Sequence, residues 1–274
     1  MQEDERTKML YNETLRGEKE TIVSDDGSLT LYSKEFNESY HSPKDGALKE
    51  SLNKHVIPAF ALHDGKPSLR ILDICYGLGY NTLATLHYIQ SQNLDVKVEI
   101  VSPEFDEALV RSLKDFEYPA EFESLRPIIE ALSTNFSYED EQFKITILIG
   151  DARKTIPQLL PAPSSLLTDK IDIVYQDAFS PKVNPMLWTR EWFSDIRALC
   201  SDDAVLTTYS TAAATRMGLY ENGFELHHYD APNTRRSLIA SPKKIESLEW
   251  IDMELKKVRN PDAKSLRDRD IALS

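Results

Sequence analysis

The sequence predicts an α/β protein with a mainly parallel seven-stranded sheet, an antiparallel edge hairpin and a small N-terminal β-hairpin/helix lobe. Three observations support this fold class. From Leu69 onward, short apolar runs alternate with longer helix-like segments. Runs such as IDIV at 171–174 are mostly apolar, which is typical of parallel strands covered on both faces. The last runs follow one another closely, which predicts an antiparallel hairpin.

The N-terminal lobe is expected to comprise residues 1–65. Two short apolar runs flank the turn dipeptide Asp26–Gly27, and this arrangement predicts a β-hairpin. A helix is expected at about 47–62. The breaker residues His-Asp-Gly-Lys-Pro at 63–67 then separate the lobe from the main domain, residues 66–241.

The main domain alternates strands with helices. Strands are expected at Leu69–Ile74, Val96–Val101, Ile145–Ile149, Ile171–Gln176, Ala204–Tyr209, Phe224–Tyr229 and Ser237–Ala240. Helices are expected near 80–91, 106–117, 123–135, 153–160, 189–199 and 211–221. The remaining segment, 242–274, is expected to form a C-terminal helix followed by a charged tail.

Composition limits the classes of function. The 274 residues include 45 acidic and 32 basic ones, a formal net charge of −13. A protein that holds nucleic acid by neutralising many phosphates needs the opposite sign. The charge therefore argues against a general nucleic-acid binder, although an enzyme could still dock through one local basic patch.

The sequence predicts a cytoplasmic protein without a membrane span. No apolar run reaches the roughly 18 residues that a transmembrane helix needs. The first ten residues, MQEDERTKML, are polar and acidic and lack the layout of a secretory signal. Cys75 and Cys200 form neither a disulfide framework nor a Cys-x-x-Cys metal pair.

The first chemical signal is the stretch LRILDICYGLGYN at 69–81. Here a buried strand ends at Asp73, and a loop with Gly77 and Gly79 leads into a helix. Such glycines let the backbone approach a nucleotide-like ligand in front of a helix N-terminus. The G-x-G-x-x-G spacing of dinucleotide sites is absent. A carboxylate beside the loop would repel pyrophosphate, but it suits the ammonium group of a methionine-like moiety.

Three further acids follow later strands. Glu104 lies where the second strand ends and could accept hydrogen bonds from a ribose diol. Asp151 follows the third strand, where a carboxylate can bind an adenine amino group, and Asp177 follows the fourth. Because ligands of open α/β sheets bind at the carboxyl ends of the strands, the four acids together indicate a nucleoside site at this edge.

With these residues the chain resembles the class I S-adenosylmethionine-dependent methyltransferases, and more specifically the MnmC-type tRNA methyltransferase domain. The specific similarity covers roughly residues 20–241. It rests on four segments: FNESYHS at 36–42, DAFSPKVNPMLW at 177–188, TYSTAAATRMGLYENGF at 208–224 and the basic pair at 235–236.

The resemblance implies a Rossmann-like class I methyltransferase fold and a reaction. The expected reaction is methylation of the exocyclic amine of 5-aminomethyl-(2-thio)uridine at wobble position 34 of a tRNA anticodon loop, giving 5-methylaminomethyl-(2-thio)uridine. In two-domain relatives an FAD-dependent oxidase domain is fused to this one. Nothing in the chain resembles it, so we expect a stand-alone enzyme that uses S-adenosyl-L-methionine, without FAD and without metal.

The resemblance also suggests roles for individual residues. Asp177 is expected to be catalytic, because it can orient the amine and help to remove its proton. The expected cofactor-binding residues are Asp73, Tyr76, Gly77, Gly79, Asn81, Glu104, Asp151 and Ala152. The expected substrate-binding residues are Phe179, Pro181, Lys182, Asn184, Arg235 and Arg236.

Two features qualify this assignment. Relatives carry a glycine where this chain has Cys75, which predicts either an extended residue or a different loop shape, since cysteine rarely adopts a positive φ.

Between Arg235 and Asp270 the chain has 10 basic and 7 acidic residues, a net of +3. We therefore expect a small RNA-binding patch that combines Arg235 and Arg236 with Lys243 and Lys244.

Other functions remain open from the sequence alone. An aminopropyltransferase resembling spermidine synthase shares this fold and an acidic site, although its Gly-Gly-Asp-Gly-Gly type of loop is missing here. Another small-amine N-methyltransferase is a further alternative. A non-catalytic binding protein is the third class, against which the four intact strand-terminal acids argue.

Overall fold

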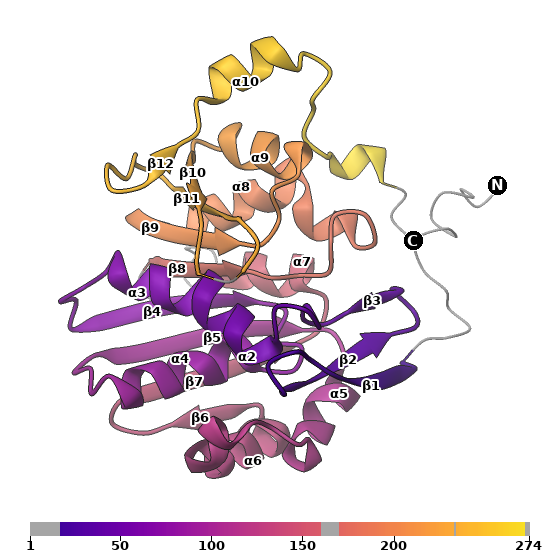
Figure 1. The fold of residues 1–274 in the computed structure, drawn as a ribbon, viewed down its shortest axis with the longest axis vertical. Coiled ribbons are helices and arrows are strands. Elements are labelled where there is room, and N and C mark those ends of the chain that lie inside the picture. The colour runs from indigo at the N-terminus through magenta and orange to yellow at the C-terminus, as the bar shows by residue number, and fades with distance from the viewer. Residues whose placement is uncertain (1–16, 160–169, 233, 272–274) are drawn as a thin grey trace.

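The computed structural model describes residues 17–159, 170–232 and 234–271. The expected lobe and tail therefore extend at 1–16 and 272–274 beyond the described residues, as does the end of the helix expected at 153–160. The described chain forms a nine-stranded central sheet and a three-stranded sheet beside it (Figure 1).

The central sheet has the strand order β12-β10-β11-β9-β8-β4-β5-β7-β6. Strands β4, β5, β7, β8 and β9 run parallel, whereas β10, β11 and the two short edge strands pair antiparallel. The bounds are β4 Ser68–Ile74, β5 Lys97–Glu104, β6 Ser137–Glu139, β7 Phe143–Ile149, β8 Ile171–Gln176, β9 Cys200–Thr208, β10 Glu225–Tyr229, β11 Ser237–Ser241 and β12 Glu249–Trp250.

This topology confirms the predicted fold class, with two additional edge strands. Strands β6 and β12 have three and two residues, which is too short for a recognisable alternation of apolar and polar side chains. The chain order reverses at β4, because β5 lies on one side of it and β8 on the other. Ligands of open α/β sheets bind at such a switch point.

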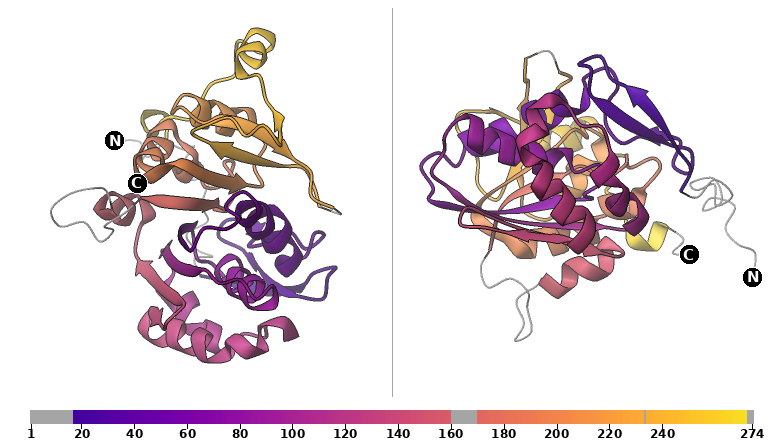
Figure 2. Two further views of the ribbon diagram at one scale, coloured as in Figure 1. Left: turned by 90° about the vertical axis from the view of Figure 1, so that its left-hand side faces the viewer. Right: turned by 90° about the horizontal axis from the view of Figure 1, so that it is seen from below.

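Helices cover both faces of the central sheet (Figures 1 and 2). Each face has its own apolar core: Ile71 and Ile173 belong to one, Leu72 and Val174 to the other. The α-helices are α2 Ala47–Glu50, α3 Ile57–Ala61, α4 Tyr80–Ser91, α5 Glu107–Ser112, α6 Arg126–Asn135, α7 Ala152–Thr155, α8 Arg190–Leu199, α9 Ala213–Tyr220 and α10 Met253–Arg259. A π-helical turn, η2 Ser51–Val56, joins α2 to α3. The 3₁₀ turns are η3 Leu113–Asp115, η4 Ala120–Leu125, η5 Ile156–Leu159, η6 Pro185–Trp188 and η7 Asp268–Asp270.

The N-terminal lobe contains the three-stranded meander β1 Lys19–Val23, β2 Leu29–Ser33 and β3 Glu38–Ser39. Its hairpin agrees with the prediction. The following helical segment, 47–61, packs directly on the central sheet, since Val56, Ala59 and Phe60 share an apolar core with Ile71 and Leu83. The lobe is thus continuous with the main domain through this core.

The C-terminal segment differs from the expectation in detail. Helix α10 begins at Met253, after Asp252 caps it by accepting the backbone N–H of Leu255 at 2.9 Å. The charged tail returns to α8, where Leu266 bridges to Thr189 and Arg267 pairs with a glutamate of that helix. Among the described helices, none has the length and apolar character to cross a membrane.

Candidate active site

The first acid of the site, Asp73, lies at the end of β4 and is fully buried. Its carboxylate accepts hydrogen bonds from Thr82 Oγ1 at 2.8 Å and Asn81 Nδ2 at 3.5 Å, both on the first turn of α4. Burial raises the pKa of Asp73 to about 7. The structure therefore places a carboxyl group of near-neutral pKa next to the glycine loop, as the sequence predicted for its position.

The glycine loop brings the backbone close to this carboxyl group. Gly79 precedes α4 with φ +74°, and no side chain caps that helix. A Cβ at Gly79 would lie 2.7 Å from the hydroxyl of Tyr76, so the Tyr76 ring occupies the space that a larger residue would need. Gly77, with φ +54°, lies against the ring of Tyr40 from the N-terminal lobe.

Cys75 adopts the glycine-like conformation of this loop. Its φ is +66°, so the extended conformation expected for a cysteine is not found, and the residue bears the steric cost of a Cβ in the left-handed region. Burial, together with Glu104 and Asp73, raises the pKa of its thiol well above the ordinary value. The thiol is therefore protonated and unreactive near neutral pH.

Glu104 lies at the end of β5, beside the glycine loop. Its two carboxylate oxygens accept the backbone N–H groups of Gly77 and Asp106, each at 2.8 Å. Burial raises the pKa of this carboxyl. These contacts hold the carboxylate beside the glycine loop, where the sequence predicted an acid that could bind a ribose diol.

Asp151 caps α7 and is held by a basic neighbour. It accepts the backbone N–H of Arg153 at 3.0 Å and forms an ion pair with the guanidinium Nη2 at 2.8 Å. Although burial opposes ionisation, these contacts hold the pKa of Asp151 below its usual value. Ala152 is buried behind it. The sequence did not predict Arg153 as the partner of this carboxylate.

Asp177, after β8, is a largely enclosed carboxylate. Its side chain is 8% exposed. Asn81 Nδ2 donates to Oδ2 at 2.9 Å, and the ring of His55 faces Oδ1 at 3.5 Å. Burial opposes ionisation, but His55, His41 and Asn81 outweigh it and lower the pKa of Asp177. Asn81 thus connects Asp73 with Asp177.

The two histidines come from the N-terminal lobe. Sequence reasoning considered His41 as a residue that could close the pocket but left it outside the catalytic set, and it did not single out His55. His41 follows β3, and His55 lies on the π-helical turn. Both are buried. Burial lowers the pKa of His41. A histidine inside an apolar helical segment gives little signal in a single sequence, because most such residues serve only packing.

The loop after Asp177 is fixed at three successive residues, which include the predicted substrate residue Phe179. Tyr209 Oη donates to the carbonyl of Ala178 at 2.9 Å, and Trp188 Nε1 donates to that of Phe179 at 2.8 Å. The backbone N–H of Ser180 donates to Glu38 at 2.9 Å. These contacts come from the main domain on one side and the lobe on the other.

The ring of Phe179 contacts two aromatic rings of the lobe. It stacks on Phe36 with ring centroids 4.7 Å apart and meets Tyr40 edge-on at 4.9 Å. Pro181 is half-buried, Lys182 is exposed, and the half-buried Asn184 closes the loop by donating its backbone N–H to Ser180 at 2.8 Å. Two residues after Asp177, three aromatic rings therefore form an apolar wall.

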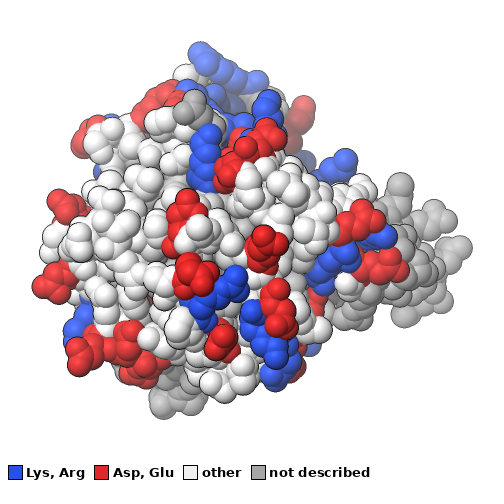
Figure 3. All heavy atoms as spheres, turned by 60° about the horizontal axis from the view of Figure 1, so that its bottom comes forward, with Lys and Arg blue, Asp and Glu red and all other residues white. Residues whose placement is uncertain are grey.

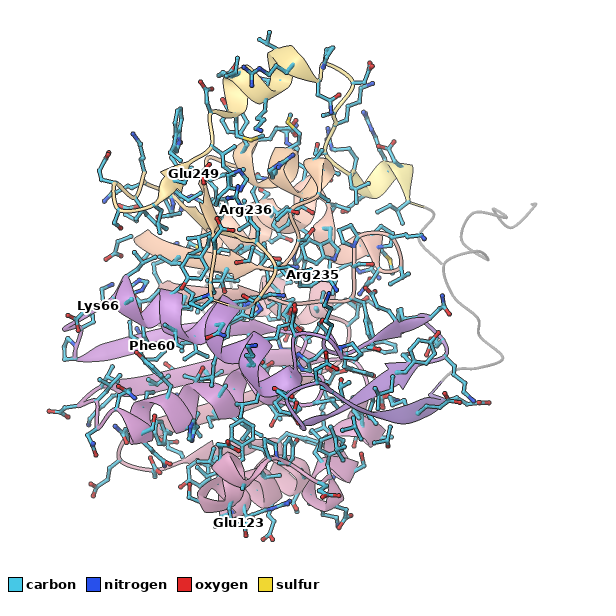
Figure 4. All side chains as sticks on the ribbon, viewed as in Figure 1. Phe60, Lys66, Glu123, Arg235, Arg236 and Glu249 are labelled. Carbon is cyan, nitrogen blue, oxygen red and sulfur yellow. The ribbon has the colours of Figure 1, made fainter. Side chains whose placement is uncertain are left out.

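The structure divides the basic patch that the sequence predicted. Arg235 and Arg236 precede β11, whereas Lys243 and Lys244 follow it, so the whole strand separates the two pairs. Arg236 is engaged by Asp230 at 2.6 Å and lies 3.6 Å from Glu249. The exposed Arg235 lies on the β10–β11 connection, on the side of the N-terminal lobe (Figure 4).

The remaining charges do not form a broad basic surface on the face drawn in Figure 3. Acidic and basic side chains are interspersed over most of it. Within the described ranges, no group of three or more His, Cys, Asp or Glu side chains is placed to hold a metal ion.

Comparisons with known proteins agree with this geometry. Residues 122–244 match a family model described as S-adenosyl-L-methionine-dependent methyltransferase. The crystal structure of MNMC2 from Aquifex aeolicus superimposes with a TM-score of 0.81 at 30% sequence identity, covering 100% of this chain and 88% of that one.

Two sequence relatives are longer than this chain. An uncharacterized protein of Methanocaldococcus jannaschii is 32% identical over 234 residues, which are 84% of this chain and 61% of that protein. The tRNA 5-methylaminomethyl-2-thiouridine biosynthesis bifunctional protein MnmC of Paracidovorax citrulli is 26% identical over 226 residues, which are 76% of this chain and 33% of that protein. The chain thus spans about a third of the bifunctional relative's length.

Proposed function

The chain belongs to the MnmC-type family of S-adenosyl-L-methionine-dependent methyltransferases, and we propose that it methylates the exocyclic amine of 5-aminomethyl-(2-thio)uridine at the wobble position of tRNA. The product is 5-methylaminomethyl-(2-thio)uridine. The observation that carries this proposal is Asp177, an enclosed and ionised carboxylate next to an apolar wall. Such a group suits a cationic amine on a planar base.

The residues around Asp73 fit the methionine end of S-adenosyl-L-methionine. When bound, this cofactor supplies a methyl group that an amine with a free lone pair can take. Among the described residues, the buried Asn81 Oδ1 has no hydrogen-bond partner, and it lies on the same turn as the uncapped N-terminus of α4. An ammonium group would satisfy Asn81 and Asp73, and a carboxylate would suit the helix N-terminus.

The other two acids complete the proposed cofactor site. We assign the carboxylate of Glu104 to the ribose diol and the carboxylate of Asp151 to the adenine amino group, next to Ala152. Tyr76, Gly77 and Gly79 shape the glycine loop, which lies beside Asp73 and Glu104.

Asp177 has two tasks in this proposal. It attracts the substrate as an ammonium ion, and it accepts a hydrogen bond from the same nitrogen after that nitrogen has released one proton. An alkylammonium is a far weaker acid than a carboxylic acid, so the carboxylate contributes more by orientation than as a strong base. The released proton passes from the amine to the carboxylate and on to solvent.

The base itself is assigned to the aromatic wall. A wobble base lies in a single-stranded loop, from which it can be extruded at small cost and stacked on aromatic side chains. We propose that Phe179 and Pro181 flank the uracil ring. Lys182 and Arg235, both exposed near this edge, are then available for phosphates, while Arg236 has an acidic partner.

The decisive experiment follows a labelled methyl group. The protein is incubated with methyl-labelled S-adenosyl-L-methionine and tRNA that carries 5-aminomethyl-2-thiouridine, with putrescine and tRNA already methylated at that amine as parallel acceptors. Label is expected in the first tRNA alone, at the wobble nucleoside. Asp177→Asn is the matched control, expected to bind S-adenosylhomocysteine normally but to lose at least about 100-fold in kcat. Label in putrescine alone, or in no acceptor, would overturn the proposal.

A further inference from the structure

We propose that His55, oriented by Thr207, is a positioning residue that points its Nε2–H at Asp177 and so fixes the carboxylate that receives the substrate amine. The inference rests on the proposed function for the identity of that amine. It assigns a task to a side chain of the N-terminal lobe, and it makes the lobe a part of the catalytic apparatus.

The position of His55 is built by an irregular helix. The π-helical turn Ser51–Val56 lies between α2 and α3, and such turns are often found at functional sites. The imidazole is 0% exposed. It meets the ring of Tyr175 edge-on at 5.7 Å, so packing limits its rotation. Its two nitrogens face two different elements, β9 on one side and the end of β8 on the other.

The contact with β9 selects the tautomer of the imidazole. Thr207 Oγ1 lies 2.8 Å from His55 Nδ1, and Thr207 is fully buried. A buried hydroxyl needs an acceptor for its proton, and Nδ1 is the one that the structure provides among the described residues. When Nδ1 accepts this bond, the ring proton of the neutral imidazole is on Nε2.

With this tautomer, the second contact is attractive. Nε2 lies 3.5 Å from Asp177 Oδ1, so the tautomer protonated on Nε2 places an N–H next to a carboxylate oxygen. The opposite tautomer would place a nitrogen lone pair against that oxygen, with no donor between two buried acceptors. At 3.5 Å this is an electrostatic contact rather than a hydrogen bond, because among the described atoms Nε2 has no hydrogen-bond partner. Asp177 Oδ1 is the carboxylate oxygen that the structure places beside Nε2.

The surroundings of Asp177 show why such a donor matters. The Asp73 carboxyl on β4 and the Cys75 thiol face it from the glycine loop side, and the Tyr209 hydroxyl lies beyond β9. All three disfavour a second negative charge when they ionise. His41, with Glu50 behind it at 3.9 Å, faces Asp177 from the lobe. Asn81 thus donates to one oxygen of the carboxylate, and His55 Nε2 faces the other.

The test measures Asp177 itself, without substrate. Protein with ¹³C-labelled aspartate side chains is titrated by NMR, and the Asp177 signal is assigned through Asp177→Asn. Thr207→Val removes the hydroxyl at constant shape, and His55→Phe removes both ring nitrogens. Both are expected to raise the pKa of Asp177 by about one pH unit or more, since each removes the directed donor. Thr207→Ser and His55→Gln retain a donor and are the matched controls, expected to titrate as wild type.

A second readout links this to turnover. With the tRNA substrate, Thr207→Val is expected to lower kcat at least about tenfold, with affinity for S-adenosylhomocysteine unchanged. An Asp177 pKa that stays at the wild-type value in both Thr207→Val and His55→Phe would overturn the inference. Because the titration uses no acceptor, it is decided even if no tRNA is methylated, and the labelled-methyl experiment tests the proposed function separately.

Discussion

The near-neutral pKa of Asp73 predicts a pH-dependent affinity for the cofactor. Its pKa rises from 3.8 to about 7, because the group is completely buried. If an ammonium group binds the ionised form, lowering the pH from 8 to 6 reduces that form from about nine tenths to about one tenth of the molecules. We therefore expect the Kd for S-adenosylhomocysteine to rise about tenfold between these pH values.

The same pKa shift predicts a change in stability with the opposite pH preference. Between pH 4 and 7 the folded protein retains a proton on Asp73 that the unfolded chain has lost. The free energy of unfolding without ligand therefore falls as the pH rises through this window, by up to about 4 kcal/mol from this group. Ligand binding should offset that loss.

The assay is isothermal titration calorimetry with S-adenosylhomocysteine, together with chemical unfolding at each pH. Asp73→Asn is the matched control, because an amide of the same shape does not titrate. Its weaker affinity should be flat between pH 6 and 8, and its stability should not show the fall between pH 4 and 7. A wild-type affinity that is constant over this range, or a variant that keeps the wild-type pH dependence, would refute the reasoning.

Three further substitutions test the loops around the site. Gly79→Ala should weaken binding of S-adenosylhomocysteine at least about tenfold, because its Cβ would lie 2.7 Å from a tyrosine hydroxyl. The control is Gly223→Ala, at a glycine with a similar φ of +78° and no atom within 4 Å of the added Cβ. It should lower the free energy of unfolding by about 1 kcal/mol and leave the Kd for S-adenosylhomocysteine unchanged. Cys75→Gly should unfold at a free energy about 1 kcal/mol higher than Cys75→Ala, since only glycine relieves the strain at φ +66°; equal denaturation midpoints would contradict this. Glu38→Ala removes the acceptor of the Ser180 N–H and should raise the KM for tRNA about tenfold with an unaltered Kd for S-adenosylhomocysteine; parallel losses in both would point to a general collapse of the lobe instead.

The sequence predicted the strands and the acids at their ends well, for a physical reason. Each of these parallel strands reads as a mostly apolar run, and each of the four acids lies at or close to the end of such a run. Parallel topology alone then brings Asp73, Glu104, Asp151 and Asp177 to one edge. These positions depend on local pattern and chain direction, both of which a single sequence contains.

Features that depend on packing between distant segments could not be predicted in this way. The predicted basic patch combined 235–236 with 243–244, which are close in sequence. The structure places these two pairs at opposite ends of β11, so the whole strand separates them. The pairing of Arg153 with Asp151 required knowledge of a side-chain direction on α7. The conformation of Cys75 was set by the surrounding loop, which imposes a positive φ in spite of the Cβ.

The segment 47–61 shows most clearly where a sequence pattern and a functional site diverge. A helix here was expected, and its interruption by a π-helical turn was not, although Pro58 lies at the start of α3 and lacks the N–H that a continuous α-helix would use. The segment buries polar side chains, including Lys54 between Asp45 at 2.8 Å and Glu50 at 2.7 Å. A helix that serves only packing would direct such groups to solvent, since burying them carries a desolvation cost. The buried polar side chains of this segment include His55, whose Nε2 lies 3.5 Å from Asp177 Oδ1. A catalytic role of the lobe would account for the desolvation cost of these buried polar side chains. It would also explain why the helical segment of the lobe packs in the core of the main domain.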